Sequence, residues 1–412
     1  MKRRVVVTGI GAISPIGNDA PTMWENAKKG TNGIDFIKRF DTESNSTKIG
    51  AEIKDFDFVE YFGRKQMKRM DRFVQLGMIA SKEAVSDSGI DFDTVDRDRV
   101  GVYYGSGIGG LDTIANEEDK AKIKGYDRIS PYFIPSAIIN IAAGQIAIDY
   151  GLNGMVTSPV TACASATNAI GDAFRAIRDG YLDMVLAGGT EASLIPLGLG
   201  GFNVMQALNK SNDPENASIP FDANRSGFVM GEGAGTLVLE TLDSALARDA
   251  KIYAEIVGYG ATCDAFHITG PDPEATGALK CMLMAVNDAG LDVTDVDYIN
   301  AHGTSTPLND KTETLAIKKA FKEHAYKLNV SSTKSMTGHL LGASGAIEGI
   351  FAVLSVKENF IPPTINTKTL DELCDLNYTL GQGVEKEVNV AISNSLGFGG
   401  HNATIAFKKY RG

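Results

Sequence analysis

A cysteine and two histidines stand in turns where their side chains could carry out chemistry. Cys163 lies between an apolar run ending at Val160 and a segment whose apolar positions recur at helical spacing. A helix N-terminus at that point would favour a thiolate, the nucleophilic form of cysteine. His302 follows another apolar run and His339 precedes a second helical segment, both within Gly/Ser/Thr-rich turns. These positions suit a nucleophilic cysteine and two histidines that assist it as polar groups.

Each of these residues also has an ordinary structural explanation. Free cysteine is among the most buried residue types, so Cys163 alone would more often be a core thiol. Either histidine alone would more often be a hydrogen-bonded structural residue. Their combination with the flexible turn Gly397–Gly400, which reads Gly-Phe-Gly-Gly, makes a catalytic centre the better interpretation.

Composition narrows the class of protein. The 412 residues are 43% hydrophobic and 22% charged, enough for a large core, and the length suggests two or three domains or two fused halves. The net charge of -11 argues against nucleic acid or an anionic membrane as a general partner. No apolar stretch approaches the ~18 residues of a membrane span. Four scattered cysteines without metal-ligand spacing predict no disulfide framework and no metal site, which fits a cytoplasmic enzyme.

The elements that must position the reactive residues occur twice. Buried strands are expected near residues 5–7, 100–105 and 183–187, and similar runs recur near 254–260, 296–301 and 388–392. Small-residue turns enter helices at corresponding places, around Cys163 and around His339. The pattern predicts two similar α/β halves, residues 1–250 with the cysteine and residues 251–412 with both histidines.

Two glycine-rich stretches accompany the cysteine. Residues 106–110 follow a strand but lack the spacing of a dinucleotide-binding turn, and Ile108 is their one large apolar side chain. Ile108 is therefore expected to form a wall of an apolar cavity. Residues 198–201 with Phe202 are expected to form a flexible, apolar loop.

A local basic cluster interrupts the acidic chain. Four of its residues, Arg64, Lys65, Lys68 and Arg69, precede Arg72, and spacings of three and four place Lys65, Lys68, Arg69 and Arg72 on roughly one helix face. Such a face is most often simply solvated. The functional alternative is a docking surface for an acidic partner.

The motifs around these residues resemble those of the β-ketoacyl-acyl carrier protein synthases. The matching stretches are TACASA at Cys163, NAHGTSTP at His302, SSTKSMTGH at His339 and SNSLGFGG near the C-terminus. Two histidines with the cysteine, together with Ile108 in its Gly-rich turn, are similar to the type II elongating enzymes. The resemblance implies a thiolase-like fold with five layers, αβαβα.

The resemblance also implies a role for each site residue. Cys163 would carry the acyl group, and His302 and His339 would stabilise the enolate formed from malonyl-thioester. Lys334 and Glu348 match a charged pair behind the histidines, and Asp310 and Glu313 match supporting acids. Phe398 matches an oxyanion donor and gate. The substrate-binding positions are Ile108 and Phe202 along the acyl tunnel, and Thr304 and Thr306 at the pantetheine arm.

The implied reaction is fatty-acid elongation by decarboxylative Claisen condensation. Acyl-carrier protein and malonyl-carrier protein would give 3-oxoacyl-carrier protein and CO₂ through an acyl-Cys163 intermediate. The enzyme would need no cofactor, because the acyl carrier protein supplies the phosphopantetheine, and a homodimer is expected. Alternatives are a polyketide-type or CoA-dependent ketosynthase, or a non-catalytic subunit resembling chain-length factors. The two departures from the family pattern are Asn309 and His401.

Overall fold

One long mixed sheet runs through the molecule. The computed structural model describes residues 2–412, so residue 1, where the expected first half begins, lies outside the described part. Ten strands follow one another in the order β10-β9-β13-β14-β8-β1-β7-β6-β4-β5. Strands β1 and β8 join the two halves of this sheet through a short antiparallel pairing of Val5–Val7 with Ala254–Ile256.

The strand order within each half is the same. The first half contains β1 (Val5–Ile13), β4 (Val100–Gly105), β5 (Val156–Thr157), β6 (Met184–Glu191) and β7 (Gly233–Thr241). The second contains β8 (Ala254–Cys263), β9 (Tyr298–Asn300), β10 (Asn329–Ser331), β13 (Val390–Gly397) and β14 (His401–Lys408). In each half three neighbouring strands pair in parallel, β5-β4-β6 and β10-β9-β13, and one strand, β7 or β14, pairs antiparallel with the strand on either side of it. The boundary between residues 250 and 251 stays a prediction.

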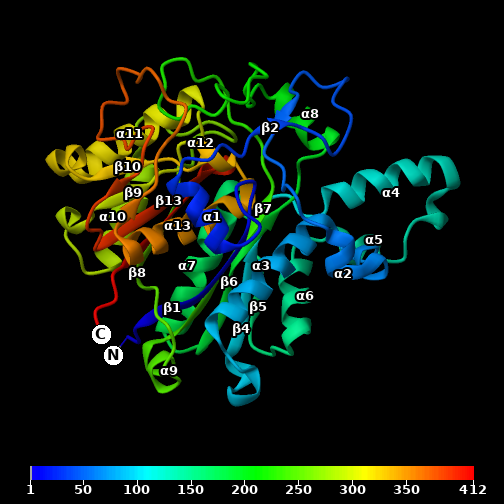
Figure 1. The fold of residues 1–412 in the computed structure, drawn as a ribbon, viewed down its shortest axis with the longest axis horizontal. Helices are drawn as coiled ribbons and strands as arrows, with labels where there is room; N and C mark the ends of the chain where they lie inside the picture. Colours follow the sequence, from blue (N-terminus) through cyan, green and yellow to red (C-terminus); the bar gives the residue numbers. More distant parts are fainter. Residues whose placement is uncertain (1) are drawn as a thin grey trace.

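Helices complete five layers around these strands. Helices α7 (Ser165–Arg178) and α13 (Ser344–Glu358) lie between the two halves of the sheet and contact strands of both. Helix α3 (Arg72–Ser88) covers β1 and β7 on the outer side of the first half, beside α6 (Ile141–Tyr150). Helices α10 (Thr276–Asp288) and α11 (Pro307–Phe321) cover the second half (Figure 1).

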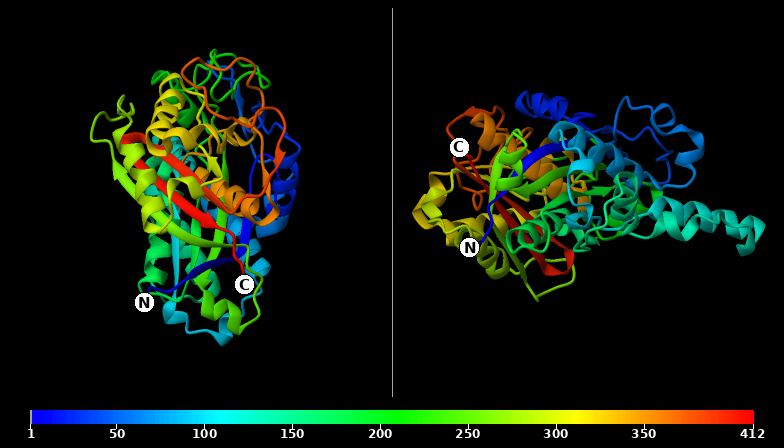
Figure 2. Two further views of the ribbon diagram at one scale, coloured as in Figure 1. Left: turned by 90° about the vertical axis from the view of Figure 1, so that its left-hand side faces the viewer. Right: turned by 90° about the horizontal axis from the view of Figure 1, so that it is seen from below.

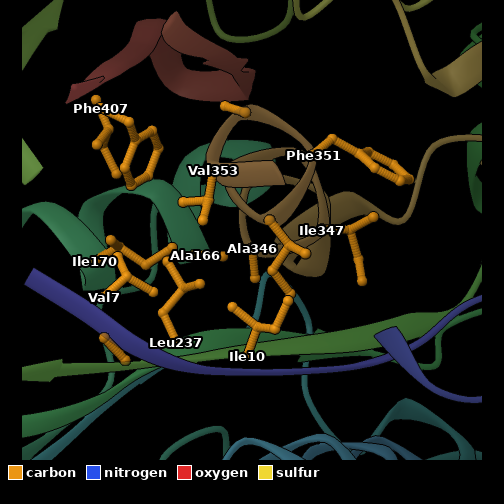
Figure 3. Packing of buried hydrophobic residues seen from close by; sticks show 14 of the residues in the cluster. Val7, Ile10, Ala166, Ile170, Leu237, Ala346, Ile347, Phe351, Val353 and Phe407 are labelled. Atoms are coloured by element: carbon orange, nitrogen blue, oxygen red, sulfur yellow. The ribbon is translucent and has the colours of Figure 1, made fainter. Parts of the chain in front are cut away.

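The core lies around the two central helices. Figure 3 shows Ile170 of α7 and Phe351 of α13 among side chains from the strands above and below them. Burying each such side chain stabilises the fold by about 1.5–3 kcal/mol. The two helices approach so closely that a Cβ added to Gly345 would lie 1.9 Å from Oγ1 of Thr167. Small residues at these positions therefore bring the two helix N-termini together.

Shorter elements surround the layers. The remaining helices are α1 (Ala20–Lys28), α2 (Phe58–Met67), α4 (Leu111–Lys124), α5 (Phe133–Ala137), α8 (Pro196–Val204), α9 (Leu242–Ala247) and α12 (Lys334–Thr337). Two small ribbons pair β2 (Asp35–Phe36) with β3 (Ile49–Gly50) and β11 (Phe360–Ile361) with β12 (Val384–Glu385). Helix α4 projects from the body as an arm (Figure 2). Within residues 2–412, no helix has the length and apolar character needed to cross a membrane.

The expected loop at residues 198–201 is a helix, and that expectation was wrong. Pro196 starts α8 at a position where its missing N–H costs nothing. Gly198 is required by packing rather than by flexibility, because a Cβ there would lie 2.1 Å from the carbonyl oxygen of Ser193. Leu199 is fully buried. Tertiary packing therefore outweighs the low helix propensity of three glycines.

Candidate active site

Cys163 sits in a tight turn at the entrance to α7. The turn is a 3₁₀ segment over Ala162–Ala164, and Ala162 adopts the left-handed conformation with φ of 51°. The half-buried sulfur does not favour the thiolate that the helix N-terminus led us to expect. Burial raises the pKa of the Cys163 thiol to about 12, although the charge of Lys334 and the N–H of Phe398 act in the opposite direction. The resting nucleophile is therefore a thiol that needs a base.

His339 is the candidate for that base, because it lies at hydrogen-bond distance from the sulfur. Its Nε2 lies 3.1 Å from Sγ of Cys163, and its Nδ1 lies 2.9 Å from the hydroxyl of Ser344. The backbone N–H of His339 donates to the carbonyl of Val229 at 2.7 Å, which fixes the residue. Burial, followed by the charge of Lys334, holds the pKa of His339 well below its usual value. The neutral ring can accept a proton from the thiol.

His302 approaches the cysteine from the other side. It follows β9, and both carboxylate oxygens of Glu313 accept backbone N–H groups, from His302 and Gly303, at 2.8 Å each. The rings of His302 and His339 are nearly perpendicular, with centroids 5.3 Å apart. Burial lowers the pKa of His302, with further contributions from Lys334 and His339. Burial raises the pKa of Glu313 to about 7, against the hydrogen bonds it accepts.

Lys334 determines which nitrogen of His302 carries the proton. Its Nζ lies 3.4 Å from Nδ1 of His302 and forms an ion pair with Glu348, and both charged side chains are buried. An ammonium group can only donate, so Nδ1 of His302 accepts and the ring proton lies on Nε2. His302 therefore presents an N–H donor to the cavity. Ser344 can donate or accept, so His339 can adopt either tautomer.

The second supporting acid, Asp310, holds the turn that follows His302. Its oxygens accept the backbone N–H groups of Phe221 at 2.8 Å and Ser305 at 3.2 Å. Asn309, one of the two unusual residues, donates from its side-chain amide to Asp310 at 3.1 Å and so reinforces this turn. The hydroxyls of Thr304 and Thr306 lie 3.0 Å apart on the same turn.

These residues open onto one cavity of about 900 Å³. Its wall includes Cys163, His302, His339, Thr304, Thr306, Phe202 and Phe398. Phe398 directs its backbone N–H at the sulfur of Cys163 and is followed by Gly399 and Gly400, both with positive φ. His401, the other unusual residue, is half-buried, and its ring lies against Gly399. The geometry brings together the nucleophile, two imidazoles and a backbone donor.

Apolar side chains extend this site inward. Ile108, Phe202 and Cys163 pack against one buried cluster that includes Phe228 and Leu341. Phe202 meets Phe228 edge-on at 5.3 Å between ring centroids, and Phe398 at 6.4 Å. The arrangement provides an apolar environment for an acyl chain beside the sulfur.

The basic cluster lies apart from the cysteine and does not form a single face. Arg64 and Lys65 belong to α2, Lys68 and Arg69 follow its end, and all four are exposed. They line a surface hollow of about 520 Å³ that Tyr132 also borders. Arg72, expected on the same face, points inward instead and pairs with buried Glu232 at 2.7 Å. The helix breaks before Arg72, because a new helix begins after the N-cap Asp71.

The Sγ and ring nitrogens of Cys163, His302 and His339 lie within 4.8 Å of one another. Cysteine and histidine are also zinc ligands. The Lys334 ammonium beside His302 opposes a divalent cation at this place by charge repulsion. The cluster is therefore better suited to acyl chemistry than to metal binding.

Comparisons with known proteins agree with this geometry. Sequence profiles of the β-ketoacyl synthase N-terminal and C-terminal domains match residues 2–245 and 253–368. The chain belongs to the β-ketoacyl synthase family. It is 51% identical to a 3-oxoacyl-[acyl-carrier-protein] synthase 2 from Synechocystis sp., over 100% of this chain and 99% of that protein. The family resemblance and the enzyme class expected from the sequence are thereby confirmed.

Two solved structures confirm the fold. The ishigamide ketosynthase/chain length factor superposes with a TM-score of 0.94 at 34% identity, covering 100% of both chains. AntDE:AntF, a type II polyketide synthase acyl-carrier protein in complex with its ketosynthase, gives 0.91 at 33% identity, again over 100% of both chains. The thiolase-like α/β architecture of the family is thus the architecture of this chain.

Sequence reasoning missed two residues of the site. Ser344 hydrogen-bonds His339, and Glu191 accepts hydrogen bonds from turns on both sides of the cysteine. The signal for Glu191 was a carboxylate at the end of an apolar strand, two residues after Gly189. A charge at such a place is seldom buried without specific partners. Ser344 carried no comparable signal.

Proposed function

We propose that the chain elongates fatty acids by condensing acyl-acyl carrier protein with malonyl-acyl carrier protein. The observation that carries this proposal is the convergence of Cys163, His302 and His339 on the wall of one cavity. A thiol beside a neutral base suits thioester exchange, and two neutral imidazoles suit an oxyanion.

The first half-reaction transfers the acyl group to the enzyme. Nε2 of His339 accepts the thiol proton while Sγ of Cys163 attacks the acyl thioester. The backbone N–H groups of Cys163 and Phe398 stabilise the tetrahedral oxyanion. The carbon–sulfur bond to the carrier breaks, and the departing pantetheine thiolate takes the proton from His339. The acyl chain then lies along Ile108 and Phe202.

The second half-reaction forms the carbon–carbon bond. The malonyl carboxylate leaves as CO₂, and its bonding electrons form an enolate whose oxygen accepts hydrogen bonds from His302 and His339. The enolate carbon attacks the acyl-Cys163 carbonyl, whose oxyanion again faces the two backbone N–H groups. Collapse breaks the bond to sulfur and releases 3-oxoacyl-carrier protein, and the thiolate regains a proton. Lys334 and Glu348 keep His302 neutral and oriented throughout.

The exposed basic residues support an acidic carrier protein as partner. Arg64, Lys65, Lys68 and Arg69 are unusual in a chain of net charge -11, and they surround one hollow. A structural relative is itself an acyl-carrier protein complex with its ketosynthase. The phosphopantetheine of that partner would carry both substrates, with Thr304 and Thr306 beside the arm, so the enzyme needs no cofactor of its own.

A homodimer in the cytoplasm completes the proposal. Strand β5 ends the sheet and its Val156 is 39% exposed, and Tyr132 and Ile134 at α5 are 38% and 60% exposed. Exposed apolar residues beside an edge strand suit an interface between copies, with Tyr132–Ile134 reaching toward the partner's acyl pocket. The unpaired cysteines, Cys163 included, suit a reducing compartment.

The test compares donors and measures intact mass. We expect octanoyl-carrier protein to add one acyl group to the wild type faster than octanoyl-CoA does, and to add none to Cys163→Ala. Malonyl-carrier protein should then release the 3-oxodecanoyl product. Preference for the CoA donor would favour a CoA-dependent ketosynthase, and no adduct from either donor would favour a non-catalytic subunit.

A further inference from the structure

A buried carboxylate connects two turns that belong to opposite halves of the chain. Glu191, the last residue of β6, is fully buried. Its Oε2 accepts the backbone N–H of Gly107 at 2.8 Å and that of Gly342 at 3.1 Å. Its Oε1 accepts the hydroxyls of Ser193 at 2.9 Å and Ser106 at 3.3 Å. The two turns thus share one oxygen atom.

Each bound glycine neighbours a side chain of the apolar cluster at the cysteine. Gly107 precedes Ile108, and Gly342 follows Leu341, and both apolar side chains pack in the cluster that contains Cys163. Gly342 also lies three residues after His339. A shift of either turn would therefore move a wall of the acyl site. A shift of the turn at Gly342 would also displace His339.

The turns are in direct contact, which leaves little tolerance in their spacing. A Cβ added to Gly342 would lie 2.2 Å from the backbone nitrogen of Gly107 and 2.8 Å from Oε2 of Glu191. A Cβ on Gly107 would lie 2.9 Å from the same oxygen. The length of the Glu191 side chain therefore sets the distance that both turns keep from β6.

We propose that Glu191 is a positioning residue that sets the width of the acyl site between Ile108 and Leu341, and with it the selection of acyl chain length. This inference rests on the proposed function. Glu191 acts through the two turns and touches neither substrate nor the reacting sulfur in the described contacts. The role depends on reach and on accepting two N–H groups, rather than on negative charge.

Two substitutions separate reach from charge. Glu191→Asp keeps the carboxylate but is one methylene shorter, so it cannot hold both N–H groups from the same backbone position. Glu191→Gln keeps the reach, because its carbonyl can accept both N–H groups and its NH₂ can donate to the two serine hydroxyls. The measurement is kcat/KM for dodecanoyl- and hexanoyl-carrier protein in condensation, and the ratio between the two donors.

We expect the aspartate variant to lose about 100-fold in kcat/KM for the dodecanoyl donor, the cost of roughly 1 Å of misplacement. The shorter donor should lose less, so the ratio should fall by at least about tenfold. The glutamine variant should keep the wild-type ratio. Glu83→Asp is the matched control, because Glu83 also accepts two backbone N–H groups, from Ala12 and Ala20 at 2.7 and 2.8 Å, outside the cavity. It should lower the melting temperature without changing the ratio.

An unchanged ratio in Glu191→Asp, or a fall in Glu191→Gln alone, would overturn the proposal. If the aspartate variant does not fold, Ser193→Ala removes one of the two hydroxyls that hold Oε1, so the carboxylate can shift and carry both turns with it. A lower ratio in that variant supports the proposal, and an unchanged ratio contradicts it. Failure of the proposed function is recognised separately, since the wild type would then form no acyl-enzyme from either donor.

Discussion

The two halves of the chain repeat one turn and place different residues at its centre. In the first half, Ala162 has φ of 51° and opens the 3₁₀ turn that enters α7. In the second half, Leu341 has φ of 49° and opens the 3₁₀ turn that enters α13. The middle residue is Cys163 in one turn and Gly342 in the other. Only one half therefore carries a nucleophile at this place.

The turns that follow β4 and β9 also differ between the halves, but here the second half carries the reactive side chain. After β4 the chain continues through Ser106 and Gly107, and after β9 it reaches His302 and Gly303. A buried glutamate accepts backbone N–H groups of each turn, Glu191 in the first half and Glu313 in the second. The same kind of anchor thus holds an apolar wall in one half and an imidazole in the other.

The difference shows how a repeated scaffold produces an asymmetric site. The first half supplies Cys163 and the apolar side chains Ile108 and Phe202, and the second supplies both histidines, the Lys334–Glu348 pair and the apolar Leu341. Because α7 and α13 pack against each other, the two turns meet at one cavity. The two half-reactions should accordingly respond to substitutions in different halves.

The largest expected effect is that of Cys163→Ala. This substitution removes the acyl-carrying residue of the first half and leaves both histidines of the second half in place. Condensation should fall by at least about 10⁴-fold, as expected when a covalent nucleophile is removed. Decarboxylation of malonyl-carrier protein should persist, because His302 and His339 remain neutral and in place. The measurement is CO₂ release alongside product formation. Loss of both activities in a folded variant would show that the halves do not act separately.

The reciprocal substitution is His302→Ala. Acylation of Cys163 by octanoyl-carrier protein should continue, because His339, rather than His302, lies within hydrogen-bond distance of the sulfur. Decarboxylation should fall by about 10²–10³-fold, the usual cost of one oxyanion donor. Single-turnover acyl transfer, followed by intact mass, distinguishes the two steps. A variant that cannot be acylated would assign His302 to the first half-reaction instead.

The convergence of Cys163, His302 and His339 could be predicted from the sequence because the motifs that carry them are local. Cys163 and His302 each stand in a turn between a strand and a helix, His339 stands in the turn between α12 and α13, and the repeated order of strands made their convergence foreseeable. The protonation state of Cys163 was not foreseeable in this way. It depends on burial by segments far away in sequence, which outweighs the helix N-terminus.

Spacing alone could not distinguish Lys68 from Arg72. Both fit one helical face in the sequence, but Asp71 caps a new helix and turns Arg72 toward Glu232. Residues 198–201 were misread for a related reason, since glycine serves close packing there as well as flexibility. The deciding contact of Arg72 is with Glu232, far away in the sequence, and that of Gly198 is with the carbonyl of Ser193, five residues earlier, and spacing predicts neither contact.

A smaller effect is expected on the pH dependence of the second half. In the double variant Lys334→Met/Glu348→Gln, the first substitution removes the cation beside both histidines. The second substitution is needed because the carboxylate of Glu348 would otherwise be left as an unpaired buried charge. The pKa values of His302 and His339 should rise, since Lys334 is one of the causes that lower them. Decarboxylation is expected to depend on the neutral imidazoles, which protonation removes at low pH. The acid limb of its pH profile should therefore move to higher pH. An acid limb that is unchanged or moves to lower pH would contradict this.

The smallest expected effect concerns the first half's surface, where Lys68 and Arg72 make a matched pair. Lys68 is exposed beside the hollow at Tyr132, so Lys68→Ala should raise KM for acyl-carrier protein about twofold to fivefold without changing the melting temperature. Because solvent ions screen exposed charges, 0.5 M salt should remove the difference between variant and wild type. Arg72→Ala should instead lower the melting temperature, because it leaves the buried carboxylate of Glu232 with less compensation. If both variants changed only the KM, Arg72 would behave as a docking residue like Lys68 despite its inward orientation, and the predicted difference between the two would be wrong.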